Sequence, residues 1–194
     1  NVQFEHFSYS KLNTFKTCPQ KFKIIYLDGI RKNDESIEAF VGKRVHGVLE
    51  WLYNNKKSFI TFDDICNVFD NQWKIEWHNK IYIADSRRNA DYYYSIGKLC
   101  LSNYYNQYGP TFNEKVNSTE IKLEFKIGEH KFIGVIDRLD NPEVGKWIVF
   151  DYKTGKSIKS EKQAYNDIQL GLYHFAIEQN FDNVKEIFLT WHFL

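Results

Sequence analysis

Three charged side chains interrupt an otherwise apolar stretch between Gly134 and Ser157. Asp137 is expected to end one strand, while Asp151 and Lys153 occupy alternate positions of the next and should point to the same face of a sheet. A hairpin between these strands would bring both carboxylates and the ammonium to one end of the sheet. Two carboxylates there could hold a divalent cation able to polarise a phosphate, and the lysine could position a nucleophile or offset developing negative charge.

The same residues also have a purely structural interpretation. Buried charges are costly unless they are paired, so Lys153 could simply form a salt bridge with one of the aspartates. An isolated Asp-x-Lys pair most often has that role, and such a network would bind no metal. The third charged group, Asp137, favours a metal site, but both interpretations stay open at this point.

Helices are expected through the first half of the chain. Two short ones are predicted over 8–26, broken at Cys18-Pro19 because proline is tolerated at the start of a helix and not in its middle. Apolar residues recur at helical spacing over 36–54 and predict a longer helix. Aromatic-rich helices are expected over 63–77 and 88–108, before the breaker pair Gly109-Pro110.

Strands dominate the second half. Apolar and charged residues alternate over 121–127, and a turn at Gly128-Glu129 leads to a strand over 131–137. A turn at 141–145 then leads to a third strand over 146–153, so the three form a meander. A helix over about 161–179 and a strand over 185–193 follow. The predicted fold class is α/β, with a mixed sheet flanked by helices.

Length and composition suit one domain over residues 1–194, of which 43% are hydrophobic. We expect its core at about 36–54 and 117–194, with a helical insertion at about 58–110. No apolar stretch reaches the roughly 20 residues needed to cross a bilayer, so a cytoplasmic protein without membrane contact is predicted. The chain begins with Asn1 and contains no methionine, so we do not expect it to be a complete translation product.

Charge is unevenly distributed along the chain. The formal net charge of +1 excludes a protein that binds polyanions with its whole surface. Residues 1–57 nevertheless carry 10 Lys and Arg against 6 Asp and Glu, whereas residues 58–194 carry 16 against 19. Several N-terminal cations are interleaved with Tyr9, Phe15 and Phe22 and could line a nucleic-acid channel, although each singly is more often a solvated charge. They are Lys11, Lys16, Lys21, Arg31, Lys43 and Arg44.

Four motifs in succession resemble a known family. GVID at 134–137, DYKTG at 151–155 and QLGLY at 169–173 resemble the motifs of the RecB-type branch of the PD-(D/E)xK nuclease superfamily, close to the CRISPR-associated exonucleases. GKRVH at 42–46 lies where that branch carries an additional metal-binding histidine. SKLNTFKTCP at 10–19 is similar to its N-terminal segment. The restriction-endonuclease-like core of that family has the same order of elements as the one predicted above.

The resemblance implies a metal-dependent deoxyribonuclease that hydrolyses phosphodiester bonds with Mg²⁺ or Mn²⁺. Its activity would be exonuclease-like, with endonuclease activity as the open alternative, on single-stranded DNA or duplex ends, in DNA repair, recombination or phage or CRISPR DNA processing. His46, Asp137 and Asp151 would be the metal ligands, and Lys153 would act in catalysis. The alternative is a non-catalytic nucleic-acid-binding or scaffold module with the same fold. A broken acidic pair would mark such a module, and here both aspartates are present.

The histidine can be weighed by its place on the helix. Helical phase puts His46 away from the apolar stripe, on a face with Gly42 and Glu50. It is therefore either the ligand that the resemblance implies or an ordinary polar-face side chain. An imidazole ligand would suit Mn²⁺ better than Mg²⁺.

Three further residues complete the candidate site. Gln169 and Tyr173 lie one helical turn apart, and the resemblance implies catalytic roles for both, with Gln169 bonding a water or a phosphate. Tyr173 could equally belong to the packed face of its helix. Glu120, expected just before the first strand, is a weak candidate acid and is predicted to be solvated.

Cysteine is where the chain departs from the resemblance. Many relatives bind an iron–sulfur cluster through one cysteine near the N-terminus, which Cys18 matches, and three after the last core strand. Cys66 and Cys100 lie elsewhere in the chain. Four thiolates are the usual requirement, so no cluster is expected in this chain. Either a C-terminal cysteine segment has been removed or this member never had one.

Overall fold

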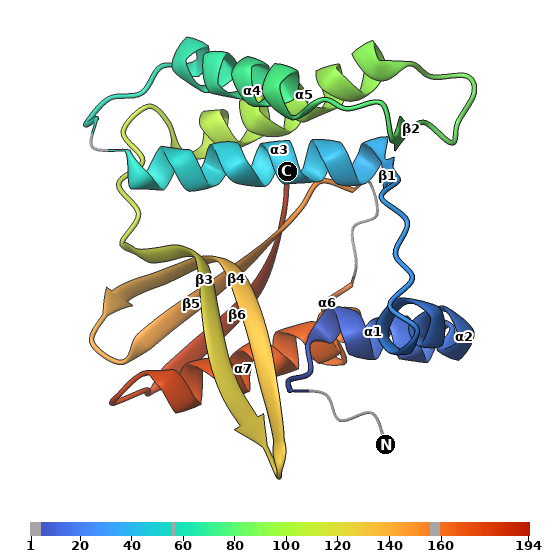
Figure 1. Ribbon diagram of the computed structural model, residues 1–194. Helices are drawn as coiled ribbons and strands as arrows, with labels where there is room; N and C mark the ends of the chain where they lie inside the picture. The colour runs from blue at the N-terminus through green and yellow to red at the C-terminus, as the bar shows by residue number, and fades with distance from the viewer. Residues whose placement is uncertain (1–4, 56, 156–159) are drawn as a thin grey trace.

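A four-stranded sheet forms the centre of the structure, a computed structural model that describes residues 5–55, 57–155 and 160–194 (Figure 1). The strands lie in the order β3-β4-β5-β6. The first two neighbouring pairs are antiparallel, whereas β5 and β6 run parallel, so the sheet is mixed. The strands span Val116–Ile127 (β3), His130–Glu143 (β4), Lys146–Lys153 (β5) and Glu186–Phe193 (β6).

Helices cover both faces of this sheet, which confirms the predicted α/β class. Above it in Figure 1 lie α3 (Ile37–Asn54), α4 (Phe62–Glu76) and α5 (Ala90–Tyr108). Below it lie α6 (Glu161–Tyr165), α7 (Ile168–Asn180), α1 (Tyr9–Thr17), α2 (Pro19–Phe22) and the π-helical turn η1 (Lys23–Leu27). A second, parallel pair of short strands consists of β1 (Glu35–Ser36) and β2 (Ile81–Tyr82).

Each face of the sheet has its own hydrophobic core. On one face, apolar side chains of α3, α4 and α5 pack together with Tyr152 of β5. On the other face, α7 packs against side chains of β3, β4 and β5, among them Ile136 and Val149. The site strands β4 and β5 are therefore held from both sides.

Helix α3 carries His46 and forms where the apolar spacing predicts it. The Ser36 side chain accepts a hydrogen bond from the backbone N–H of Ala39 and caps the first turn. The apolar stripe is buried, as expected, and His46 lies off it. No helix in the described ranges is long and apolar enough to span a membrane.

The hairpin strands are longer than the sequence pattern predicts. Strand β3 begins at Val116 rather than at 121, because Val116–Thr119 pair with Arg138–Asp140 of β4 across a register shift. Strand β4 likewise continues to Glu143. There the Asn141 side chain donates to the carbonyls of Glu143 and Lys146 and bridges the two sides of the hairpin end. Alternation of apolar and charged residues did not predict these pairings, because polar side chains interrupt the alternation there.

The helix predicted over 161–179 is in fact two helices. Asn166 ends α6, with its backbone N–H directed at Ala164, and Asp167 starts α7 by accepting a hydrogen bond from the backbone N–H of Leu170. A side chain that caps a new helix satisfies orphan N–H groups and allows the chain to change direction.

Candidate metal centre

The candidate site lies where β4 and β5 separate. The antiparallel pairing of these strands includes Arg138 opposite Phe150. Asp137 and Asp151 are the next residues, on the side where the pairing stops. There the backbone N–H of Tyr152 donates to the Asp137 carboxylate over 2.7 Å. Asp137 therefore lies within β4 and does not end the strand as expected, but it does lie beside Asp151.

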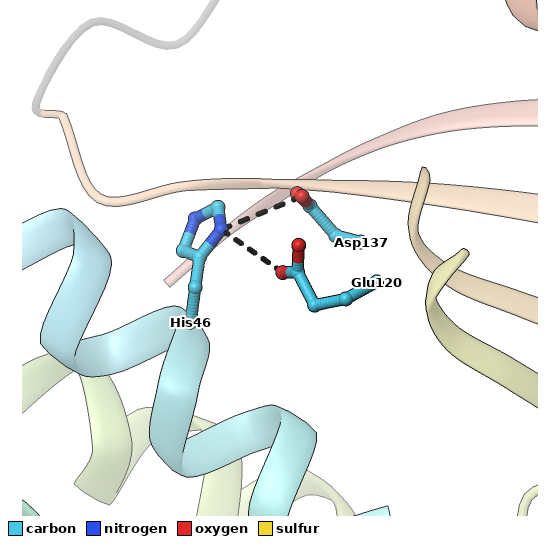
Figure 2. Close-up of side chains that lie close together, drawn as sticks. All are labelled: His46, Glu120 and Asp137. Atoms are coloured by element: carbon cyan, nitrogen blue, oxygen red, sulfur yellow. Dashed lines mark ion pairs between the residues drawn. The ribbon is translucent and has the colours of Figure 1, made fainter. Parts of the chain in front are cut away.

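Three side chains from three elements meet at this point, as Figure 2 shows. The His46 Nδ1 atom of α3 lies 3.4 Å from Asp137 Oδ1 and 4.0 Å from Glu120 Oε1. One ligand atom from each residue falls within 4.8 Å of the others. This is the only group of three or more potential metal ligands that the described part of the chain brings so close together.

Glu120 corrects the expectation drawn from the sequence. It lies inside β3 and is half-buried, not solvated before the strand. The flanking pairs Thr119–Arg138 and Ile121–Ile136 place it across from Asp137. Its φ of 47° is unusual for a residue with a long side chain and is a sign of local strain. The strained backbone accompanies a carboxylate directed at the histidine.

The charges in the site are incompletely balanced. Burial raises the pKa of Asp151, Lys153 lowers it, and the charge of Asp137 raises it again. Burial also raises the pKa of Glu120, together with the charge of Asp137. For His46, burial opposes protonation, but the hydrogen bond and charge of Asp137 outweigh it and raise the pKa. Crowded carboxylates are a setting in which a bound cation relieves repulsion.

Asp151 and Lys153 form an ion pair on β5, with Asp151 only 4% exposed. The salt bridge of the structural interpretation is therefore present. Asp151 is not part of the compact group of His46, Glu120 and Asp137. Asp151 does lie on the strand next to Asp137, whose charge raises the pKa of Asp151. Its role as a metal ligand stays a prediction.

The predicted pair on α7 is hydrogen-bonded together. The Gln169 side chain donates to the Tyr173 hydroxyl over 3.0 Å, and that hydroxyl donates to the carbonyl of Val135 over 2.9 Å. Burial, with the charges of Asp151 and Asp137, raises the pKa of Tyr173, which favours the protonated donor. Tyr173 thus packs against β4 two residues before Asp137, and the predicted catalytic roles of Gln169 and Tyr173 stay predictions.

An open groove gives access to the site from the side of α3 and α4. It has a volume of about 660 Å³ and includes both His46 and Glu120 in its lining. Glu50, which shares the helix face with His46, lies in the same groove, as does the Arg44–Glu76 ion pair, whose closest atoms are 3.4 Å apart. A substrate therefore has a route to two of the three candidate ligands.

The donor set fits a divalent cation. Carboxylate oxygens are ligands of Mg²⁺ and Mn²⁺, and a neutral imidazole adds a nitrogen that transition metals accept. Asp137 contributes a second interaction that orients it, because its other oxygen accepts from Tyr152. His46, Glu120 and Asp137 would hold the cation.

Comparisons with known proteins identify the family and the fold of the chain. A solved structure described as "Putative exonuclease" from Eubacterium rectale is similar over 97% of this chain and 68% of that chain, with 16% identity and a TM-score of 0.56, a likeness of fold. Comparison with curated proteins finds no match. The sequence profile of the PD-(D/E)XK nuclease superfamily matches residues 6–193. Because this match spans nearly the whole chain, the protein belongs to the PD-(D/E)XK nuclease superfamily.

Proposed function

We propose that the chain is a divalent-metal-dependent deoxyribonuclease of the RecB-type branch, with exonuclease-like activity and one nuclease domain over residues 1–194. The observation that carries the proposal is the convergence of His46, Glu120 and Asp137 beside the Asp151–Lys153 pair. Family membership supports a nucleic-acid substrate. DNA as the nucleic acid, Mg²⁺ or Mn²⁺ as the cation, and a role in DNA processing are parts of the proposal.

Each residue has a distinct role in this proposal. His46, Glu120, Asp137 and, from β5, Asp151 would hold the cation, which when bound supplies polarisation of a phosphate and a lowered pKa of water. The Lys153 ammonium would position the nucleophile and offset negative charge that develops on the phosphate. The hydrogen bond from Tyr152 holds Asp137 in place. Tyr173 supports the segment of β4 that leads to Asp137.

A scaffold that binds nucleic acid without cleaving it is the competing function. It would not need the acidic pair, and both Asp137 and Asp151 are present at the site. Nor does a structural role for Asp151 and Lys153 account for Glu120, whose backbone has the unusual φ of 47° and whose carboxylate lies 4.0 Å from His46. Strain at an acid directed at other potential ligands favours a functional site.

The direct test combines cleavage and metal binding. The protein is incubated with labelled single-stranded and duplex DNA in Mg²⁺, Mn²⁺ or chelator, and Mn²⁺ affinity is measured by calorimetry. Asp137→Ala should abolish cleavage and Mn²⁺ binding in a folded protein. The matched control Asp182→Ala, which removes an exposed carboxylate, should leave both intact. Undiminished Mn²⁺ affinity in folded Asp137→Ala, or parent protein that cleaves DNA equally in chelator, would falsify the assignment.

Glu120 allows a second, sharper test, because charge and backbone strain can be separated. Glu120→Gln keeps the strained backbone and removes the charge, whereas Glu120→Gly removes both. Both variants should lower Mn²⁺ affinity by about 10–100-fold. The glycine variant should be at least as stable to urea as the glutamine variant, because glycine adopts positive φ without steric cost. Unchanged Mn²⁺ affinity in both variants would exclude Glu120 from the site.

A further inference from the structure

A second open groove lies between the N-terminal helical segment and the short strand β2. It has a volume of about 790 Å³. The segment that lines it leads directly into β1 and α3, the helix that carries His46. In Figure 1 it climbs along the edge of the molecule from α2 to β1. The residues on which the argument rests are Lys21, Tyr26, Ile30, Arg31, Lys32 and Tyr82, and we call this site the basic groove.

Three cations of the basic groove have no carboxylate partner in the described part of the chain. Neighbouring cations do: Lys23 pairs with Asp28, Lys43 with Glu35, and Arg44 with Glu76. Lys43 and Arg44, expected to line a nucleic-acid channel, are thus engaged elsewhere. Lys21, Arg31 and Lys32 are exposed and form no ion pair with any described residue, and Asp34 is the single acid among the described residues of the lining. The groove is therefore locally positive in a chain of almost zero net charge.

Aromatic rings accompany these cations. The Arg31 guanidinium lies 5.9 Å from the centre of the Tyr26 ring. The ring of Phe22 lies 5.0 Å from Tyr26 and 5.3 Å from Phe15, so three rings follow one another along the N-terminal helices. Across the groove, Tyr82 is 51% exposed. Tyr82 is exposed and Tyr26 is half-buried, and such rings beside unpaired cations suit bases that stack and phosphates that need a counter-charge.

We propose that the basic groove binds single-stranded DNA and holds the substrate of the nuclease outside its metal centre. This inference rests on the proposed function. A single strand offers both a charged backbone and free base faces, whereas a duplex keeps its bases stacked and would use only the cations. A protein segment would use the apolar lining, such as Ile30, but would leave three cations unmatched.

The test separates charge from stacking. Fluorescence anisotropy with a labelled 20-nucleotide oligo(dT), and with a blunt duplex of equal length, is measured in chelator so that no cleavage occurs. Arg31→Gln with Lys32→Gln should make the negative slope of log affinity against log salt shallower by about 1.4. This is about 0.7 for each lost phosphate contact on a single strand. Tyr82→Ala should lower oligo(dT) affinity about 5- to 150-fold with the salt slope unchanged.

The matched control is Lys126→Gln with Lys131→Gln, which removes two exposed cations from the β3–β4 hairpin. This control should bind oligo(dT) as the parent does. Circular dichroism checks that every variant is folded.

Three results would contradict the proposal that the basic groove binds single-stranded DNA. Unchanged oligo(dT) affinity in both groove variants would exclude DNA as the ligand and favour a protein segment as the occupant of the basic groove. If Tyr82→Ala weakened duplex binding as much as oligo(dT) binding, the groove would not be specific for single strands. If the control variant lost as much oligo(dT) affinity as the groove variants, the effect would be one of net charge. Because binding is measured in chelator, the proposed function fails separately. Parent protein that cleaves no DNA, yet shows the groove effects, would overturn the nuclease assignment and support the groove.

Discussion

Two charge clusters begin on successive residues of β4 and are built in opposite ways. Arg138 is 1% exposed, and its guanidinium donates to both carboxylate oxygens of Asp140. It also donates to the hydroxyls of Tyr53 and Tyr104, over 2.9 and 2.6 Å, and its face lies 4.2 Å from the centre of the Phe150 ring. We call this the arginine cluster, and its ion pair is buried, with a hydrogen-bond partner for each guanidinium nitrogen.

Asp137, the preceding residue, belongs to a cluster that is open and unbalanced. Three carboxylates, those of Asp137, Glu120 and Asp151, share one ammonium and one imidazole. A buried ion pair whose polar atoms all have partners is a structural device, whereas buried carboxylates that outnumber their cationic partners favour a bound cation. The difference teaches that burial of charge alone does not mark a candidate site, and that incomplete pairing is what separates the two clusters.

The two clusters are also mechanically joined. Tyr152 lies between Asp151 and Lys153 in the sequence, and its hydroxyl is 3.2 Å from that of Tyr104 in the arginine cluster. Its backbone N–H donates to Asp137. The arginine cluster therefore holds the strand that carries Asp151 and Lys153. The comparison predicts that changes in the arginine cluster act first on stability, and that changes in the candidate metal centre act on binding and rate.

The largest effect is expected from Asp140→Ala. It leaves Arg138 charged, buried and without its carboxylate, a loss that typically costs about 3–5 kcal/mol of unfolding free energy. Urea denaturation followed by circular dichroism measures the change. The double variant Arg138→Met with Asp140→Leu serves as the control and should recover much of this loss, because no charge is then left unpaired. Equal stability of parent and Asp140→Ala would mean that the arginine cluster does not hold the sheet.

Lys153→Ala should act on rate and leave the metal in place. An ammonium cannot coordinate a cation, so Mn²⁺ affinity measured by calorimetry should be retained. Cleavage should fall by about 10²–10³-fold, the usual effect of losing one group that stabilises developing charge. Lys146→Ala, at the other end of β5, is the matched control and should cleave as the parent does. Loss of Mn²⁺ binding in step with rate would instead show that Lys153 organises the aspartates.

His46→Ala should weaken Mn²⁺ more than Mg²⁺, because nitrogen ligands favour the transition metal. The expected loss of Mn²⁺ affinity is about 10–100-fold, and cleavage should be partly rescued by raising Mn²⁺. Titration of both metals against the variant, with cleavage measured at each concentration, tests this. His174→Ala removes a partly exposed histidine of α7, far along the chain from the candidate ligands, and is the control. Titration curves that match those of the parent would show that His46 is an ordinary polar-face side chain of its helix and not a metal ligand.

The smallest effect concerns pH and the arginine cluster. Burial, and then the charge of Arg138, lower the pKa of His192 from 6.5 to about 4. The unfolded chain therefore binds more protons than the folded one between these values, and stability should fall as the pH drops from about 6.5 to 4. Because His192 is partly exposed, we expect a contribution of only about 1 kcal/mol.

Urea unfolding of parent and His192→Gln at pH 7 and pH 5 measures this contribution. The parent should lose more stability than the variant over that interval. An identical loss in both proteins would show that folding does not lower the pKa of His192.

Much of the fold could be predicted from local pattern. The helix that carries His46, the strand with Asp151 and Lys153, and the turn at Gly128-Glu129 all lie where spacing and turn residues predict them. Each depends on neighbours within a few positions, and that information is visible along the chain. Where pairing is non-local, as in the first residues of β3, the pattern failed.

The candidate site shows the same division. The sequence by itself determined which residue types are available and placed His46 off the apolar stripe of its helix. It named Glu120 only as a weak candidate acid and predicted it to be solvated, because that side chain is brought to the site by a positive φ and by the register of β3 on β4.

Only the tertiary structure decided which charges are sealed and which are left open. Arg138 meets Tyr53 of α3 and Tyr104 of α5, residues far apart in the chain, while Asp137 beside it meets His46 and Glu120. Two adjacent residues of one strand thus acquired different environments from the elements packed around them. The energy of a buried charge depends on its partners in space, and neither composition nor periodicity contains that information.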